Sequence, residues 1–284
     1  MDWHYSYLVR IYVAGINGMV GSAIALEAKA QGQEVVGKSS RDLDFTNRTD
    51  VIQELISIKP DSLVIAAAKV GGIGANNSFP VEFLSDNLTI QGNLMNAAHK
   101  AGVPNFVFLG SSCIYPRDCA QPIKEEYLMT GPLEETNSAY AIAKIAGIEL
   151  INSYRKEYGT KWISLMPTNL YGPRDNFDLT ASHVLPAFIR RFIEAAESGA
   201  DKVTLWGSGT PLREFLHVDD LAQAVVVASE KYDSSLHLNV GSGEDLSIKE
   251  LATKVAAAAG FAMAAVSAGG LTTAVTVGVT TGAS

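Results

Sequence analysis

The sequence predicts an α/β protein built on a doubly wound parallel sheet, followed by a smaller C-terminal domain. Short segments that are apolar throughout alternate with segments of helical period over the first 167 residues, and a glycine-rich turn follows the first strand. Strands without polar alternation are typical of a parallel sheet that helices cover on both faces. Right-handed crossover connections between such strands place helices on both faces and give a doubly wound sheet.

The expected strands are rich in Val, Ile and Phe, whereas the expected helices repeat apolar residues every three or four positions. The strands are predicted at 9–14, 34–37, 62–67, 105–109 and 161–166. The helices are predicted at 19–30, 49–58, 81–101 and 139–158, and Pro60 ends the second of them. These segments define a first domain over residues 1–167.

Beyond Pro167 the alternation becomes irregular, because long polar stretches at 167–182 and 207–218 interrupt shorter elements. We expect residues 168–214 and 242–284 to form a smaller substrate-binding domain, and the segment 215–241 to return to the first domain. The last 30 residues, 255–284, carry no charge, although about five charged residues would be expected at 18%. Residues 255–261 are expected to end a helix.

The end of the chain, 262–284, is atypical because Gly, Ala, Ser and Thr dominate it. That composition argues against a transmembrane helix. Two interpretations remain: a low-complexity segment, or a tail translated in the wrong frame.

Composition excludes several classes of protein. A chain of 284 residues with 47% apolar residues is too hydrophobic for an intrinsically disordered protein. Two cysteines exclude a disulfide scaffold and fit the cytoplasm. The net charge of -8 argues against nucleic acid or an anionic membrane as partner, but allows a small anion bound by local cations. His, Cys and Asp do not cluster at metal-ligand spacing, so no metal is expected.

The turn after the first strand reads Gly15-Ile-Asn-Gly18-Met-Val-Gly21 and opens a helix. Glycines there allow a tight turn and a close approach of the backbone to a pyrophosphate, whose charge the helix N-terminus favours. The spacing is G-x-x-G-x-x-G, and a purely structural turn is the alternative. The strand–turn–helix context favours a dinucleotide site.

The second strand ends in Gly37-Lys38-Ser39-Ser40-Arg41, where an NAD site would usually have a carboxylate for the ribose diol. Cations and hydroxyls suit a 2′-phosphate, so NADP is favoured over NAD. Alternatively, Lys38 and Arg41 are solvated loop charges. Asp42 and Asp44 are candidates to accept from the adenine amino group, or to cap the helix ahead.

Tyr140 and Lys144 form Y-x-x-x-K inside a predicted helix, so both side chains lie on one face. A neighbouring ammonium favours the phenolate and is expected to lower the pKa of the tyrosine, which can then protonate a carbonyl oxygen as hydride arrives. The pair lies one helix after Ser111, at the carboxyl end of the strand 105–109, where doubly wound sheets bind ligands. Ser111 can hydrogen-bond the same carbonyl.

These motifs together resemble the extended short-chain dehydrogenase/reductase superfamily, with its Rossmann-like fold. Within it the chain resembles the GDP-L-fucose synthase family, over about residues 9 to 261. The similar stretches are AGINGMVGSAI (14–24), AAAKVGGIGANN (66–77), LGSSCIYP (109–116), EETNSAYAIAKIAGIEL (134–150), MPTNLYGPRDNFD (166–178), SHVLPAFIRRF (182–192) and LWGSGTPLREFLHVDDLA (205–222). These motifs are long and specific to the subfamily.

The resemblance implies a bifunctional epimerase and reductase that converts GDP-4-keto-6-deoxy-D-mannose to GDP-L-fucose with NADPH. It assigns the acid and base of the 3,5-epimerisation to Cys113 and His183, and the protonation of oxygen 4 to Tyr140. A thiol and an imidazole can both exchange protons near neutral pH. From the residues alone, Cys113 is equally an inert buried thiol and His183 a surface residue of a first helical turn.

The resemblance further implies a cofactor site, a sugar-nucleotide site and a homodimer formed through the helices at 81–101 and 139–158. The cofactor site comprises Gly15, Asn17, Gly18, Met19, Val20, Gly21, Arg41, Asp42, Asp44, Lys69, Lys144, Pro167, Asn169, Leu170 and His183. The GDP-sugar site comprises Arg191, Trp206 and Arg213, where guanidinium groups suit a diphosphate. We expect His217 to shape a loop, and Cys119, His4, His99 and His237 to have no role.

Residues 262–284 depart from the family, which continues there with a charged stretch that closes the substrate domain. The change puts part of the sugar-nucleotide pocket in question. Two other functions therefore stand beside the leading one. The first is another nucleotide-sugar epimerase or reductase, and the second is an NADP-binding protein that its altered C-terminus leaves inactive.

Overall fold

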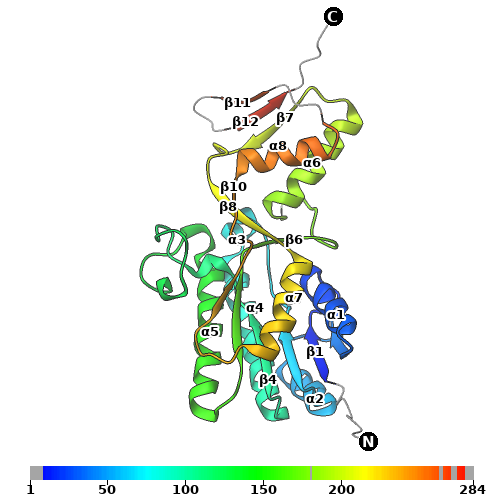
Figure 1. Cartoon of the computed structure of the whole chain (residues 1–284), viewed down its shortest axis with the longest axis vertical. Coiled ribbons are helices and arrows are strands. Elements are labelled where there is room, and N and C mark those ends of the chain that lie inside the picture. Colours follow the sequence, from blue (N-terminus) through cyan, green and yellow to red (C-terminus); the bar gives the residue numbers. More distant parts are fainter. Residues whose placement is uncertain (1–8, 180, 262–264, 270–273, 279–284) are drawn as a thin grey trace, which may run out of the picture. The chain divides into compact units, whose positions relative to one another are not determined.

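The computed structural model describes residues 9–179, 181–261, 265–269 and 274–278 (Figure 1). The chain divides into two compact units. The first comprises Met1–Arg174 and Leu216–Gly241, and the second comprises Asp175–Phe215 and Ser242–Ser284. Each unit is built around its own sheet and helices.

The first unit contains a six-stranded sheet in the order β2-β1-β3-β4-β5-β9, and every neighbouring pair is parallel. Its strands are β1 (Arg10–Ala14), β2 (Glu34–Lys38), β3 (Ser62–Ile65), β4 (Asn105–Leu109), β5 (Ile163–Pro167) and β9 (Leu238–Val240). All residues of β3 and β5 are buried. This burial on both faces is what their largely apolar sequences predict, although each strand also buries one serine, Ser62 or Ser164, and it confirms the expected doubly wound α/β fold.

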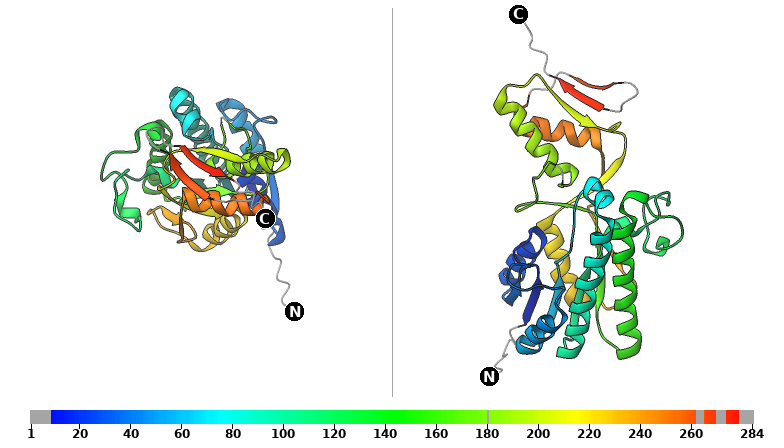
Figure 2. Two further views of the ribbon diagram at one scale, coloured as in Figure 1. Left: turned by 90° about the horizontal axis from the view of Figure 1, so that it is seen from above. Right: turned by 180° about the vertical axis from the view of Figure 1, so that it is seen from behind.

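Helices cover both faces of this sheet, with α1 and α7 side by side on one face and α2, α4 and α5 on the other (Figures 1 and 2). Their bounds are α1 (Met19–Ala30), α2 (Arg48–Ile58), α4 (Pro80–Ala101), α5 (Ser138–Tyr158) and α7 (Val218–Lys231). A short helix, α3 (Ile73–Ser78), precedes α4. The carboxyl ends of the parallel strands therefore meet at one edge of the layered unit.

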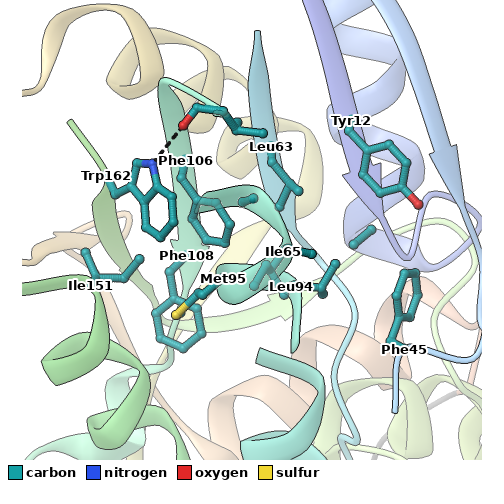
Figure 3. Close-up of a cluster of buried hydrophobic side chains, with 14 of the residues drawn as sticks. Tyr12, Phe45, Leu63, Ile65, Leu94, Met95, Phe106, Phe108, Ile151 and Trp162 are labelled. Atoms are coloured by element: carbon teal, nitrogen blue, oxygen red, sulfur yellow. Dashed lines mark hydrogen bonds between the residues drawn. The ribbon is translucent and has the colours of Figure 1, made fainter. Parts of the chain in front are cut away.

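The core beneath α4 and α5 mixes aromatic and aliphatic side chains (Figure 3). The rings of Phe106 and Trp162 stack with centroids 4.7 Å apart. The indole N–H of Trp162 donates to the carbonyl of Val103 at 3.1 Å, so this buried side chain keeps a polar partner. The packing fixes β4 and β5, which lead to the site.

A long connection joins β4 to α5 and carries three 3₁₀ turns, whose bounds are η1 (Ser112–Ile114), η2 (Glu125–Tyr127) and η3 (Glu135–Asn137). The strand β6 (Asn169–Tyr171) follows β5 shortly afterwards. Both segments begin at the carboxyl ends of parallel strands, where a doubly wound sheet places its ligand-binding loops.

The second unit packs α6 against α8 beside a three-stranded sheet in the order β11-β12-β7. Its elements are α6 (Val184–Ser198), β7 (Lys202–Trp206), β10 (Asp245–Ser247), α8 (Ile248–Ala258), β11 (Ala265–Gly269) and β12 (Ala274–Gly278). Strand β8 (Leu212–His217) pairs antiparallel with β10. The rings of Phe192 and Phe261 lie 5.7 Å apart in the core of this unit.

The uncharged end of the chain adds two strands to this sheet, which the sequence analysis did not expect. β12 pairs antiparallel with β7, from Ala274 opposite Trp206 to Gly278 opposite Lys202, and β11 pairs with β12. The alternation A-V-T-V-G is rich in β-branched residues, which favour strands. The rest of 262–284 lies outside the described residues. Among the helices described, none is long and apolar enough to span a bilayer.

Candidate active site

The glycine turn, which runs from the end of β1 into α1, is too tight for a side chain at two of its glycines, Gly15 and Gly21. Gly15 has φ +87°, and a Cβ on Gly21 would lie 2.2 Å from the Gly15 carbonyl oxygen. Gly18 is the N-cap residue of α1, with no side-chain cap bond and no acidic residue in the first turn. Asn17 and Gly18 are exposed, and Met19 and Val20 are half-buried. This arrangement fits a pyrophosphate, since backbone N–H groups at a helix N-terminus bind anions.

The loop after β2 is organised by one carboxylate. Asp42 accepts from the backbone N–H of Ser39 at 3.0 Å and from its hydroxyl at 2.6 Å, which lowers the pKa of Asp42. The Arg41 side chain is exposed, and Lys38 lies 3.8 Å from Glu54. The loop thus presents a cation next to a rigid turn, which suits a phosphate.

Neither candidate aspartate caps the following helix, so that alternative is wrong. The N-cap of α2 is Asn47, whose side chain accepts from the N–H groups of Thr49 and Asp50. Asp44 instead accepts from the backbone and hydroxyl of Thr46. Asp42 and Asp44 both stabilise turns within the loop.

The segment after β3 is held by a buried asparagine that the sequence analysis missed. The Asn87 side chain accepts from the Lys69 N–H at 2.9 Å and donates to the Lys69 carbonyl at 3.0 Å. The Lys69 ammonium lies 2.6 Å from the Glu82 carboxylate, which raises the pKa of the lysine. An asparagine within the apolar stripe of α4 was the available signal, since a buried amide needs partners.

Ser111 and Cys113 lie together at the carboxyl end of β4. The hydroxyl oxygen of Ser111 accepts from the Cys113 N–H at 3.4 Å and so caps η1. The Cys113 thiol is half-buried. Its burial raises the pKa of the thiol, while the hydrogen bond to Ser111 and the charge of Lys144 oppose that shift.

Tyr140 and Lys144 lie on the face of α5 that packs against η1. The Lys144 ammonium is buried, 5.6 Å from the centroid of the Tyr140 ring, and donates to the Leu109 carbonyl at 2.9 Å. The ring of Tyr140 meets Phe83 edge-on at 6.4 Å. The structure therefore brings the predicted Tyr–Lys pair, Ser111 and Cys113 to one place.

The expectation that Lys144 lowers the pKa of Tyr140 is wrong for this geometry. Burial raises the pKa of Tyr140, and the neighbouring Cys113 raises it further. Burial also lowers the pKa of Lys144 to about 8, so the ammonium is itself destabilised. Burial disfavours the phenolate of Tyr140 and the ammonium of Lys144 alike, and this effect is the largest cause of both shifts.

The remaining cofactor candidates of the first unit follow β5. Pro167 is the buried last residue of β5, and the N–H of Thr168 donates to the Val240 carbonyl at 3.1 Å. Asn169, which is exposed, and Leu170, which is half-buried, lie on β6. They stand at the same carboxyl edge of the sheet as Ser111.

The second unit holds the other candidates. His183 is the exposed N-cap residue of α6. Arg191 donates to the Thr204 carbonyl at 3.4 Å, and the exposed Arg213 donates to the Leu212 carbonyl at 2.7 Å. Trp206 ends β7, and its side chain lies outside the described residues. The backbone contacts orient both guanidinium groups, which retain further N–H donors for an anion.

Two histidines outside the proposed site, His217 and His237, have different surroundings. His217 was expected to shape a loop, but β8 ends at His217 and α7 begins at Val218, and the histidine caps α7 by accepting from the Asp219 N–H at 3.2 Å. His237, for which no role was expected, is buried and lies 2.9 Å from the Tyr115 hydroxyl. Among the described residues, no group of three or more His, Cys, Asp or Glu could hold a metal ion.

The parallel sheet, the glycine turn and the Ser–Tyr–Lys set define a dinucleotide-dependent enzyme of the extended short-chain dehydrogenase/reductase class. The chain belongs to the NAD dependent epimerase/dehydratase family, whose model matches residues 11–241.

Similar proteins carry sugar-nucleotide names. A GDP-L-fucose synthase of Sinorhizobium fredii is 50% identical over 89% of this chain and 80% of its own length. The GDP-L-fucose synthase of Escherichia coli is 47% identical over 89% and 82% of the two chains. A crystal structure of a Naegleria fowleri GDP-L-fucose synthetase bound to NADP matches with a TM-score of 0.79, at 29% identity, over 89% and 79% of the two chains.

Proposed function

We propose that this protein is a GDP-L-fucose synthase, which epimerises GDP-4-keto-6-deoxy-D-mannose at carbons 3 and 5 and reduces it at carbon 4. The observation that carries the proposal is the set of Ser111, Cys113, Tyr140 and Lys144 at the carboxyl end of β4. It is supported by the 50% identity to a protein of that name. Reduction needs only Ser111, Tyr140 and Lys144. The thiol of Cys113 beside them adds a group that can exchange a proton, which favours epimerisation in addition to reduction.

NADP(H) is the proposed cofactor, and it supplies the hydride for carbon 4 when it is bound. The glycine turn fits its pyrophosphate, and the exposed Arg41 fits its 2′-phosphate. The residues proposed to hold it are Gly15, Asn17, Gly18, Met19, Val20, Gly21, Arg41, Asp42, Asp44, Lys69, Lys144, Pro167, Asn169, Leu170 and His183. Two of the loops that carry these residues are held by hydrogen bonds. Asp42 bonds Ser39 in the loop after β2, and Asn87 bonds Lys69 in the segment after β3.

Tyr140 is the proposed general acid for oxygen 4. Its raised pKa keeps the phenol protonated at neutral pH, so that it has a proton to donate. Ser111 is proposed to donate a hydrogen bond to the same oxygen. Lys144 supplies positive charge behind the phenol, and this charge offsets the phenolate that forms when the proton leaves.

Cys113 and His183 are the proposed proton-transfer residues of the epimerisation. The 4-keto group makes the hydrogens on carbons 3 and 5 acidic, so one group removes a proton and the other returns one to the opposite face. Burial raises the pKa of Cys113, so the thiol carries a proton that it can donate, and Ser111 and Lys144 limit that rise. Arg191, Trp206 and Arg213 are proposed to bind the GDP moiety.

We also propose a cytoplasmic homodimer. The two cysteines are free thiols, which fits a reducing compartment. The paired helices α4 and α5 expose apolar side chains, including Leu88 and Ile142, which suit an interface. Sedimentation equilibrium tests the dimer.

The test of the function is product analysis in deuterated water with NADPH and GDP-4-keto-6-deoxy-D-mannose. The proposal expects GDP-L-fucose with deuterium at carbons 3 and 5. A reduced sugar that keeps the D configuration without deuterium would identify a reductase alone. Turnover of a different keto-sugar nucleotide, with none of this one, would contradict the proposed substrate. NADPH binding without turnover would favour the inactive-protein alternative.

A further inference from the structure

The hydroxyl of a buried tyrosine connects the Cys113 turn to the far edge of the sheet. Tyr115, 4% exposed, follows Cys113 by two residues. Its hydroxyl lies 2.9 Å from Nε2 of His237 and donates to Oδ1 of Asn239. Asn239 lies in β9, and His237 is the residue just before β9. The turn η1 follows β4, and β5 lies between β4 and β9 in the sheet. The Tyr115 hydroxyl therefore connects the segment after β4 to β9, which is not a neighbour of β4 in the sheet.

The hydrogen-bond directions in this cluster are determined by the groups present. A tyrosine hydroxyl has one proton, which it donates to Asn239. Nε2 of His237 must therefore carry a hydrogen and donate to the Tyr115 oxygen. Burial lowers the pKa of His237, so the neutral imidazole with its proton on Nε2 is the form that fits.

Asn239 also holds the connection between η1 and α5. Its side-chain amide donates to the Ile123 carbonyl at 3.3 Å, and its backbone N–H donates to the Glu125 carboxylate at 3.0 Å. The connection that runs from Cys113 toward Tyr140 is thus attached to β9 at two further points. Tyr115 is the member of this cluster closest in sequence to Cys113, which it follows by two residues along the chain.

The turn that carries Cys113 is consequently fixed at both ends. At its start, the hydroxyl of Ser111 accepts from the Cys113 N–H. At its end, Tyr115 is the C-cap residue, with an extended backbone (φ −79°, ψ 155°) that the following Pro116 favours. The buried ring packs into the core, and the hydroxyl contacts add a directional attachment at this end of the turn.

We propose that His237 and Asn239 are positioning residues for Cys113, acting through the Tyr115 hydroxyl. The inference rests on the proposed function, in which the Cys113 thiol exchanges protons with the keto-sugar. Proton transfer requires the thiol within hydrogen-bond reach of its target, and small displacements cost large factors in rate. A tilt of η1 would affect the thiol more than the Tyr140–Lys144 pair, which α5 holds.

The test replaces Tyr115→Phe, which keeps the ring and removes only the hydroxyl. Tyr232→Phe is the matched control, because its hydroxyl donates to the Leu236 carbonyl at 2.8 Å in the segment that leads to His237. Both changes are made in a Cys119→Ser background, so that Cys113 is the one thiol. The readouts are alkylation of Cys113 by iodoacetamide as a function of pH, NADPH affinity, and deuterium exchange at carbons 3 and 5 of GDP-4-keto-6-deoxy-D-mannose.

The expected result for Tyr115→Phe is a loss of about tenfold in exchange and a shifted alkylation profile, with NADPH affinity changed by less than about twofold. His237→Leu should behave like Tyr115→Phe, and His237→Gln should restore exchange to within about threefold, since its amide N–H replaces Nε2–H. Equal exchange and alkylation in Tyr115→Phe and Tyr232→Phe would overturn the proposal. So would His237→Gln failing to differ from His237→Leu when both bind NADPH normally.

The alkylation profile separates this inference from the proposed function. If the unsubstituted enzyme exchanges no deuterium, the proposed function fails. An alkylation profile that still differs between Tyr115→Phe and Tyr232→Phe would then support the positioning of Cys113 alone, and identical profiles would overturn it.

Discussion

The ammonium of Lys144 donates to the carbonyl of Leu109 at 2.9 Å, and this bond joins α5 to the last residue of β4. One helical turn earlier on α5, the Tyr140 ring lies 5.6 Å from the same ammonium. Two residues after Leu109 the chain reaches Ser111. A single buried cation thus fixes the distance between the helix and the loop that carry the reductase residues.

The burial of Lys144 predicts a pH dependence. Its pKa is lowered to about 8, so the ammonium loses its proton as the pH rises through that value. The rate of NADPH oxidation should fall over the same interval, because the neutral amine no longer offsets the Tyr140 phenolate. Lys144→Arg keeps its charge and should move this fall to higher pH. An unchanged falling limb in Lys144→Arg would contradict the assignment.

Alanine substitution should have opposite effects at Gly21, in the first turn of α1, and at Gly92, inside α4. Gly21→Ala would bring a Cβ to 2.2 Å from the Gly15 carbonyl oxygen, which should cost about 1–3 kcal/mol of stability and weaken NADPH binding. Gly92→Ala, inside α4, meets nothing within 4 Å and should stabilise the protein by about 0.5–1 kcal/mol. Thermal unfolding with and without NADPH measures both. Equal effects of the two changes would count against the tight turn.

Arg41 predicts the choice of cofactor. Its exposed guanidinium, beside the turn that Asp42 fixes, should contact the 2′-phosphate. Arg41→Ser should raise the KM for NADPH about tenfold and leave the KM for NADH nearly unchanged. Lys38→Ser is the comparison, since Lys38 pairs with Glu54 and should matter less. If Lys38→Ser raised the KM for NADPH more than Arg41→Ser does, Lys38 rather than Arg41 would be the contact of the 2′-phosphate.

The second unit predicts a stability effect at the start of α8. Ser247 and Glu250 form a capping box, with the Ser247 hydroxyl accepting from the Glu250 N–H at 3.1 Å. Ser247→Ala should cost about 1 kcal/mol of unfolding free energy. Ser153→Ala, on the exposed face of α5, should cost less than about half of that. Urea unfolding followed by far-UV circular dichroism compares the two, and similar costs would argue against the box.

Periodicity predicted the first unit well because its elements are long or fully buried. The helix 19–30 and the strand 105–109 were predicted with their observed bounds. Three-residue strands such as β6 and β10 are too short to show a period, and their pairing depends on partners distant in sequence. The strands in the uncharged tail were missed because its composition suggested filler.

The candidate site was predictable where motifs place residues on one element, as for Tyr140 and Lys144. The direction in which the Tyr140 pKa shifts could not be predicted, because it depends on how η1 and α4 bury the ring. The sequence also did not show the partners of His237 and Asn87, although the position of Asn87 in an apolar helix stripe indicated that its amide needs some partner. Their partners, Tyr115 and the Lys69 backbone, are 122 and 18 residues away in the sequence. Such contacts exist only once the sheet and helices have assembled.

The most direct test of the account is NADPH oxidation at fixed GDP-4-keto-6-deoxy-D-mannose, measured for the unsubstituted enzyme and for Tyr140→Phe. The proposed role of Tyr140 predicts steady oxidation that falls by about 10²- to 10⁴-fold in the variant, because only the proton donor for oxygen 4 is removed. NADPH affinity, measured by fluorescence titration, should remain within about twofold. Oxidation by Tyr140→Phe at the unsubstituted rate would contradict the role of Tyr140 and with it the proposed reductase.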